Sequence, residues 1–311
     1  MEYWISFNEP TLYGVLTQLA GIWPSNTRNP GPWQMLTRVP RLRKQMIKAH
    51  RNLYQKFKKI DPNAKIGLAK RIDYYFGDSK ANQLLSRISH KNFNLQFLDK
   101  TWKWMDFIGI NYYGIENVKG LGISFHPKIE YTEAGRGIFP GGLPILIKEL
   151  HQRYNIKRKR SLPFIITENG IADATDWVRP AYMTEHLAAI ASLLKEGIPI
   201  EGYIFWTITD NLEWGDGYCP KFGMVEIDRA NQIKRIPRPS FELFREIATK
   251  RQISAAQREA AWSLYKSHWG DLRPFCRADD AQTSLPSPVM RELKGMDWRF
   301  VEGQSDSIFR D

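Results

Sequence analysis

Two glutamates in this sequence stand in contexts suited to acid–base and nucleophilic chemistry. Glu9 follows Asn8 at the end of the apolar run YWISF, and Glu168 precedes Asn169 at the end of the run PFIIT. Cleavage of a glycosidic bond with retention of configuration needs two carboxyl groups roughly 5 to 5.5 Å apart, one to protonate the leaving oxygen and one to attack the anomeric carbon. A lone glutamate is most often a solvated loop residue. The two glutamates therefore indicate catalysis only if the elements that carry them bring their carboxyl groups together.

Five β-rich runs alternate with amphipathic segments along the chain: EYWISFNEP, AKIGLAK, MDFIGINYYG, LPFIITENGI and IEGYIFWTITDN. This alternation predicts a parallel sheet with crossover helices, and we expect helices over residues 41–59 and 179–197. The chemically distinctive residues follow the carboxyl ends of these runs, which is the edge where (β/α)8 barrels build active sites. A closed barrel needs eight strands. We therefore expect an α/β fold of the (β/α)8 TIM-barrel type that is incomplete, with strands four to eight present in residues 1–251 and the first three missing.

The remaining residues, 252–311, have a different pattern. The stretch AAQREAAWSLYKSHWGDLRPF predicts a helix, and a polar, irregular stretch follows it to the end. Residues 279–288 contain two prolines and no apolar period, so we expect a loop there. We interpret the whole segment as a tail appended to the barrel.

The net charge of +12 suggests an anionic partner, and much of the excess lies in three basic runs at residues 38–48, 157–160 and 234–238. No nucleic-acid-binding signature accompanies them, so we expect no nucleic acid partner and favour peripheral contact with an anionic membrane. Cys219 and Cys276 form neither a C-x-x-C pair nor a disulfide framework, so either a reducing compartment such as the cytoplasm or no constraint on the compartment is consistent with them. We expect no cofactor and no metal.

The stretches FNEP and ITENG, in that order, resemble the two signature segments of glycoside hydrolase family 1, the β-glucosidase and β-galactosidase family. The resemblance implies that Glu9 is the acid/base, kept protonated before the reaction, and that Glu168 is the ionised nucleophile. It also implies that the hydroxyl of Tyr113, in IGINYYG, hydrogen-bonds to the nucleophile and favours its charged form.

The stretch FWTITDNLEW resembles the last strand and the following loop of the same family. The resemblance implies that Trp206 lies under the sugar ring, and that Glu213 and Trp214 bind its hydroxyl groups. Other residues assigned to the substrate site on the same ground are Asn8, Asn111 and Phe222. Family members that cleave phosphorylated sugars carry a lysine and a tyrosine where this chain has Pro220 and Phe222, so an unphosphorylated sugar is implied.

Beyond the second glutamate, the runs GYCPKFGMVEIDRANQIKRIPRPSFELF and DWRF look like the galactolipid galactosyltransferase branch of this family. The resemblance implies galactosyl transfer between galactolipids at a chloroplast envelope. Hydrolysis of a β-glucoside stays open as an alternative, as does an inactive fragment that acts as an interaction protein. In the family the first three strands supply a Gln and a His-Trp pair to the sugar site. We therefore expect little activity from this chain without a partner that completes the N-terminal half of the barrel.

Overall fold

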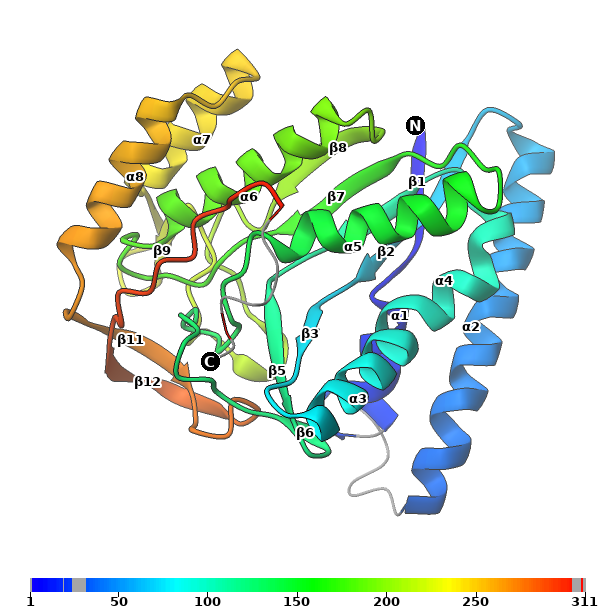
Figure 1. Cartoon of the computed structure of the whole chain (residues 1–311), viewed down its shortest axis with the longest axis horizontal. Coiled ribbons are helices and arrows are strands. Elements are labelled where there is room, and N and C mark those ends of the chain that lie inside the picture. Colours follow the sequence, from blue (N-terminus) through cyan, green and yellow to red (C-terminus); the bar gives the residue numbers. More distant parts are fainter. Residues whose placement is uncertain (1, 19, 24–31, 304–308, 310–311) are drawn as a thin grey trace.

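A computed structural model describes residues 2–18, 20–23, 32–303 and 309, and its centre is a five-stranded sheet (Figure 1). All neighbouring strands are parallel, in the order β1-β2-β4-β7-β8. The strands are β1 (Tyr3–Asn8), β2 (Lys65–Arg71), β4 (Ile108–Asn111), β7 (Phe164–Asn169) and β8 (Ile200–Phe205). These are the five predicted runs, so the sequence identified the strands of the main sheet and their direction.

Helices connect consecutive strands of the main sheet, and one further helix, α7 (Pro239–Lys250), follows β8 and a short hairpin. The connecting helices are α1 (Pro10–Gln18), α2 (Pro32–Ile60), α3 (Lys80–Ser89), α4 (Gln96–Thr101), α5 (Gly142–Leu150) and α6 (Arg179–Lys195). The predicted start of α2 at residue 41 was too late, because the helix continues N-terminally through Pro40. The predicted end of α6 was close, since Gly197, with φ of +76°, lies two residues beyond it. Among the described helices, none is both long enough and apolar enough to cross a bilayer.

The crossover helices pack on one face of the sheet and form its main hydrophobic core. This core joins Met46 of α2, Phe97 of α4, Ile147 of α5 and Leu193 of α6 to strand residues such as Ile166. Each of these side chains is at least nine-tenths buried. Burial of large apolar side chains is worth about 1.5–3 kcal/mol each, so this layer is what holds the strand ends in fixed relative positions.

The two outer strands differ from the central ones. Every residue of β4 is buried, whereas Ile5 of β1 and Ile204 of β8 are each about half exposed, at 48% and 54%. Within the part of the chain that the structure describes, β1 and β8 each pair along one edge only. The sheet is therefore open, as expected for a barrel represented by five of its eight strands.

Smaller sheets surround the carboxyl ends of the main strands. One contains β3 (Tyr74–Phe76), β5 (Ile115–Lys119) and β6 (Gly122–Ile123), and a second is the hairpin of β9 (Val225–Asp228) and β10 (Lys234–Pro237). Four residues of the basic run 234–238 form β10 and are exposed, whereas the fifth, Arg238, is buried and pairs with Asp210.

The C-terminal segment contains the predicted helix, α8 (Ala255–Ser267), followed by a hairpin that the sequence did not predict. Its strands are β11 (Leu272–Arg277) and β12 (Ser284–Glu292). The expected loop over residues 279–288 was therefore wrong from Ser284 onward. Both of its prolines fall in an irregular part of the pairing, between the pairs Phe275–Val289 and Arg277–Ser284, where a missing N–H interrupts no ladder bond. Part of the expected irregular end lies outside the described residues.

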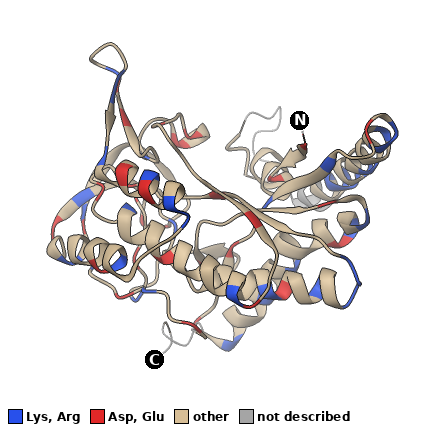
Figure 2. Cartoon of the chain, turned by 90° about the horizontal axis from the view of Figure 1, so that it is seen from above, with Lys and Arg blue, Asp and Glu red and all other residues tan. Residues whose placement is uncertain are grey.

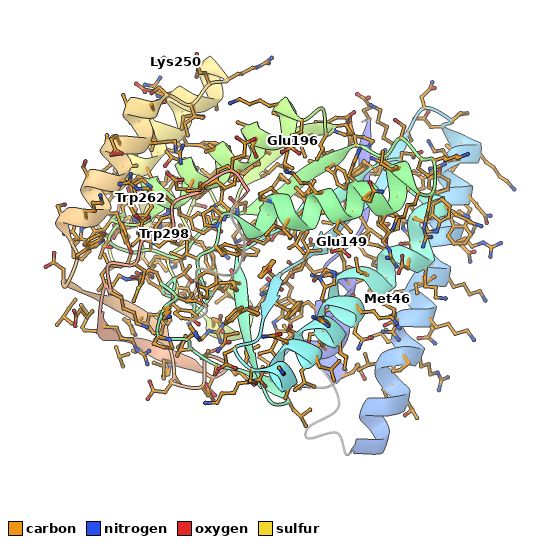
Figure 3. All side chains as sticks on the ribbon, in the orientation of Figure 1. Met46, Glu149, Glu196, Lys250, Trp262 and Trp298 are labelled. Atoms are coloured by element: carbon orange, nitrogen blue, oxygen red, sulfur yellow. A yellow bond between two sulfur atoms is a disulfide. The ribbon has the colours of Figure 1, made fainter. Side chains whose placement is uncertain are left out.

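The tail is bound closely to the barrel helices. The carboxylate of Glu185 in α6 accepts hydrogen bonds from Arg258 at 2.6 Å, from the Trp262 indole at 2.7 Å and from the Phe300 backbone N–H at 2.7 Å. Trp262 and Trp298 are almost fully buried and their rings lie 4.7 Å apart (Figure 3). These contacts fix the position of α8 and the segment around Trp298 against α6.

The two cysteines are joined, so the expectation that they form no disulfide framework was wrong. Cys219, in the loop after β8, and Cys276, in β11, form a disulfide across 57 residues of sequence with their Cα atoms 5.9 Å apart. The hairpin brings them together, and the sequence spacing alone contained no sign of it.

Candidate active site

Glu9 lies directly after β1 with its backbone in the left-handed region, at φ of +48°. Its N–H donates to the carbonyl of Ala69 in β2 at 2.8 Å, which extends the strand pairing by one residue. The side chain is only 9% exposed. A left-handed conformation is costly for a residue with a Cβ, by about 1–3 kcal/mol, and such costs concentrate at functional sites. The fold therefore holds this carboxylate at the strand end at some expense of stability.

Asn111, the last residue of β4, links the two predicted glutamates. Its amide group donates to Oδ1 of Asn8 and to Oε1 of Glu9, each at 3.0 Å. Its own carbonyl oxygen accepts the hydroxyl of Thr167 at 2.6 Å, and it is paired in register with Glu168 across the β4–β7 ladder. Asn111 is fully buried. It therefore sets the position of β1 relative to the end of β7.

Glu168 lies at the end of β7, and Tyr113 donates its hydroxyl to Oε2 of this glutamate at 2.7 Å. Burial and the negative charge of Glu9 raise the pKa of the Glu168 carboxyl to about 7, while hydrogen bonds from Tyr113 and Asn8 act in the opposite direction. The effect of the Glu9 charge on Glu168 means that the two carboxyl groups lie at the same edge, close enough to interact.

This raised pKa of Glu168 differs from our expectation that the protein environment would favour its ionised form. The reason is burial, which penalises the carboxylate more than two hydrogen bonds stabilise it. Near neutral pH a large fraction of Glu168 therefore retains its proton in the empty site.

The ring of Tyr113 is enclosed by aromatic and cationic groups. Phe222 meets it edge-on with centroids 6.3 Å apart, and the guanidinium groups of Arg136 and Arg71 lie 5.3 and 5.9 Å from its centre. Tyr113, Phe222 and Trp206 belong to one hydrophobic cluster. Phe222 thus contacts a site residue but is itself buried at 1% exposure.

Trp206 directly follows β8 and is partly exposed. Its N–H donates to the carbonyl of Asn169 at 2.9 Å, and its peptide bond to Thr207 is cis. The side chain of Asn169 binds the hydroxyls of Tyr182 and Tyr203 at 3.0 and 2.9 Å. Asn169 is therefore a connection between β7, β8 and α6, which brings Trp206 beside the end of β7.

Glu213 lies in the loop between β8 and β9, and Asn211 donates to its Oε2 at 2.9 Å. Burial raises the pKa of its carboxyl, while the Asn211 hydrogen bond and the charge of Arg136 lower it. Its charge in turn contributes to the raised pKa of Glu168. Glu213 therefore belongs to the same electrostatic cluster as the two strand-end glutamates.

Trp214 lies apart from this cluster. It is 62% exposed, its φ is +48°, and its ring stacks on Trp23, with centroids 4.4 Å apart. The structure thus joins the loop after β8 to the segment after α1. The other eight predicted site residues lie at or near the carboxyl edge of the sheet.

Arg136 is a site residue that the sequence analysis did not identify. Its guanidinium lies over Tyr113 and acts on the pKa of Glu213, and its buried Nε has no hydrogen-bond partner within the described chain. Its run, YTEAGRGIFPGGL, has no strand or helix pattern that would have predicted its position.

The arrangement provides two coupled carboxyl groups, a phenol bonded to one of them, a partly exposed indole and a third carboxylate. Carboxyl groups can exchange protons and attack an electrophilic carbon. The indole and the third carboxylate are suited to the apolar face and the hydroxyls of a sugar.

Comparison with known proteins agrees with this chemistry. The family model described as glycosyl hydrolase family 1 matches residues 103–253. A relative named galactolipid galactosyltransferase SFR2, chloroplastic, from Arabidopsis thaliana is 36% identical over 99% of this chain and 51% of its own length. A rice relative, named beta-glucosidase-like SFR2, chloroplastic, is 34% identical over 99% of this chain and 50% of its own length. The chain thus spans about half the length of these relatives.

Solved structures agree as well. The crystal structure of Fpglu1 from Fervidobacterium pennivoraus superposes with a TM-score of 0.71 at 28% identity, covering 86% of this chain and 60% of that one. The β-glycosidase from Pyrococcus horikoshii gives 0.70 at 27% identity, covering 82% and 62%. From its matched residues, its parallel sheet and these relatives, the chain belongs to glycosyl hydrolase family 1.

Proposed function

We propose that this chain carries the catalytic residues of a retaining β-glycosidase, with Glu168 as nucleophile and Glu9 as acid/base. The observation that carries the proposal is the coupling of the two carboxyl groups at one sheet edge, through Asn111 and through the effect of Glu9 on the pKa of Glu168. Two interacting carboxyl groups at one edge suit a reaction in which one member donates a proton and the other attacks.

The two steps follow from this assignment. An Oε atom of Glu168 bonds to the anomeric carbon while the bond to the leaving oxygen breaks and Glu9 transfers its proton to that oxygen. An acceptor hydroxyl then gives its proton to Glu9 and its oxygen attacks the same carbon, which releases Glu168. Water as acceptor gives hydrolysis, and a sugar hydroxyl gives transfer.

We propose an unphosphorylated β-galactoside as the substrate class, with a galactolipid as both donor and acceptor. The carboxylate of Glu213 would repel a 6-phosphate. Galactosyl transfer is supported by the name of the Arabidopsis relative. A β-glucoside is the second candidate, since relatives of this chain also include proteins named for β-glucosides.

Contact with an anionic membrane surface is supported by helix α2. Its 29 residues include nine Lys or Arg and no Asp or Glu. Arg41, Lys44, Lys48 and Arg51 recur at spacings of three and four, and all four are exposed. They lie opposite Met46 and the other residues that pack on the sheet, so they form one outward stripe. Lys and Arg residues of α2 are the blue bands on the helix at the right of Figure 2. The plant relatives named chloroplastic favour a chloroplast membrane as that surface.

Trapping of the nucleophile tests the catalytic assignment. Trapping needs a single turnover, so slow activity of the chain alone is sufficient for it. Incubation of the purified chain with an activated 2-fluoro-β-galactoside should add one fluorogalactosyl mass to the peptide that contains Glu168, and Glu168→Gln should abolish the addition. An unlabelled chain, under conditions that label a full-length family member, would contradict the assignment. That result would favour an interaction role, which the half-exposed apolar side chains of β1 and β8 also suit.

Product analysis separates transfer from hydrolysis. With monogalactosyldiacylglycerol as substrate, formation of digalactosyl lipid plus diacylglycerol indicates transfer, and formation of free galactose indicates hydrolysis.

A vesicle-binding experiment tests the membrane contact. The double variant Lys44→Gln/Lys48→Gln should cosediment more weakly with phosphatidylglycerol vesicles than the wild type, and the difference should decrease as the salt concentration rises. The matched double variant Lys234→Gln/Arg235→Gln on β10 should cosediment as strongly as the wild type. Equal losses in the two double variants would contradict a role for α2.

A further inference from the structure

The loop that carries Glu213 contacts the barrel through Trp214, whose ring stacks on Trp23, and contacts the C-terminal hairpin through Asp216. Leu212, Trp214 and Tyr218 are all more than half exposed. Its tip is a turn closed by two backbone hydrogen bonds, from the N–H of Glu213 to the carbonyl of Gly217 at 2.7 Å and from the N–H of Asp216 to the carbonyl of Glu213 at 2.8 Å. Because these bonds join Asp216 to Glu213, whatever holds Asp216 also holds Glu213.

The C-terminal hairpin holds Asp216 with two side chains. Arg277, the last residue of β11, donates to Oδ2 at 2.6 Å, and the hydroxyl of Ser284, the first residue of β12, donates to Oδ1. The side chains of Arg277 and Asp216 are only 12% and 13% exposed. An ion pair shielded from water is screened less than a surface pair, so this contact restrains the turn more strongly than an exposed pair does.

Arg277 also connects the hairpin to the loop that carries Arg136. Its Nε donates to the carbonyl of Ala134 at 2.8 Å. The side chain passes across Gly135, where a Cβ would lie 2.4 Å from Cγ of Arg277. Gly135 has φ of +71° as well, so both space and conformation favour glycine there. One guanidinium therefore joins the two loops that border the ring of Tyr113.

The disulfide supplies a third connection. Cys276 precedes Arg277, is 1% exposed, and donates its N–H to the carbonyl of Glu133 at 2.8 Å. It is bonded to Cys219, three residues beyond Asp216. The tail therefore restrains the turn at two places. One is the side chain of Asp216, and the other is Cys219, just beyond the C-terminal end of the turn.

We propose that hairpin β11–β12 positions Glu213 in the sugar site, and that Cys276, Arg277 and Ser284 are the positioning residues. The tail then contributes to substrate binding, because it holds Asp216 and through Asp216 fixes the position of Glu213. The consequence for sugar binding rests on the function proposed above, whereas the restraint of the loop does not.

Hydrogen exchange tests the restraint directly on the complete chain. In Asp216→Asn and in Cys219→Ser/Cys276→Ser, the amides of Glu213 and Asp216 should exchange at least about tenfold faster than in the wild type, while those of β4 and β7 stay unchanged. Asp279→Asn is the matched control, because it removes an exposed ion pair with Arg291 in the same hairpin. Unchanged exchange at Glu213 and Asp216 in both test variants would overturn the proposal. Two different variants are used so that a folding defect in one does not decide the result.

Trapping kinetics with the 2-fluoro-β-galactoside test the link to sugar binding. The concentration for half-maximal trapping should rise about tenfold in Arg277→Gln and recover in part in Arg277→Lys, while the maximal rate stays within about twofold, because Glu168 is not displaced. A lower maximal rate with an unchanged half-maximal concentration would overturn the positioning role. Should the wild-type chain not be trapped at all, the proposed function fails, and the exchange experiment still decides whether the hairpin restrains the loop.

Discussion

The hydroxyl of Tyr113 donates a 2.7 Å hydrogen bond to Glu168 from the loop after the neighbouring strand. This bond lowers the pKa of the Glu168 carboxyl, against the larger effects of burial and of Glu9, which leave it at about 7. The nucleophile proposed here is thus balanced between its charged and neutral forms by its immediate surroundings. Removal of the Tyr113 hydroxyl and removal of the Glu9 charge should therefore shift the pKa of Glu168 in opposite directions.

Replacing Tyr113 with Phe should raise the pKa of Glu168 above about 7, because a hydrogen bond to its charged form is lost. Attack requires the ionised carboxylate, so trapping increases as pH rises through this pKa. The midpoint of the trapping rate against pH should therefore move upward by about one pH unit. Tyr13→Phe, at a partly exposed tyrosine outside the carboxylate cluster, is the control. A midpoint equal to that of the wild type would show that the bond has no electrostatic role.

Replacing Glu9 with Gln should lower the pKa of Glu168, because a negative charge beside it is removed while its burial stays the same. The trapping midpoint should then move to lower pH than in the wild type. A 2-fluoroglycoside with a dinitrophenolate leaving group is needed, since that group departs without a proton from Glu9. A midpoint that stays near 7 would mean that the two carboxyl groups are not coupled.

The main sheet and the edge that carries the site could be predicted from the sequence because both depend on local patterns. Alternating strands and helices force a parallel sheet, and the carboxyl ends of parallel strands meet at one edge. Glu9, Asn111 and Glu168 each end a strand, so their proximity followed once the strands were identified. The raised pKa of Glu168 did not follow, because the burial of this residue depends on the packing of the whole edge.

The hairpin, the disulfide and the orientation of Trp214 could not be predicted, because each depends on contacts between distant segments. Two prolines in β12 are typical of a loop, so the sequence did not predict a strand there. They are tolerated in the strand because the pairing is irregular at that point. The sequence does not show that two cysteines 57 residues apart are bonded, because their proximity depends on the position of β11 beside the loop after β8. Trp214 faces Trp23 rather than the carboxylates because of the turn in which it lies.

Replacing Glu185 with Gln should destabilise the attachment of the tail. Its fully buried carboxylate accepts hydrogen bonds from Arg258, Trp262 and Phe300, and a neutral amide cannot balance the charge of Arg258. Because Arg258 is about one-third exposed, water offsets part of the loss, and we expect a decrease of about 2 kcal/mol in the free energy of unfolding. Urea denaturation measures it. Glu259→Gln, which removes a 3.5 Å exposed pair with Arg299, should change it by less than about 0.5 kcal/mol.

The backbone contact between Gly170 and Trp206 should tolerate no side chain. A Cβ on residue 170 would lie 1.7 Å from the carbonyl oxygen of Trp206 and 2.7 Å from its carbonyl carbon, so β7 and the segment after β8 could not remain at their present distance. The obstacle is backbone, which cannot rotate away as a flexible side chain can. Gly170→Ala should therefore displace Trp206 from the end of β7 and lower the free energy of unfolding by about 2 kcal/mol or more.

Two measurements on Gly170→Ala check this together. Urea denaturation reports the loss of stability, and trapping kinetics report the displaced indole as a higher half-maximal concentration of the 2-fluoro-β-galactoside. Gly14→Ala is the matched control. Its added methyl would meet Leu42 of α2 at 3.7 Å, an ordinary contact. Gly14 lies in α1, and alanine favours a helix over glycine by about 1 kcal/mol, so the control should be as stable as the wild type or more so. If Gly170→Ala retained wild-type stability and trapping, the close approach of these two segments would not be what fixes Trp206 beside Glu168.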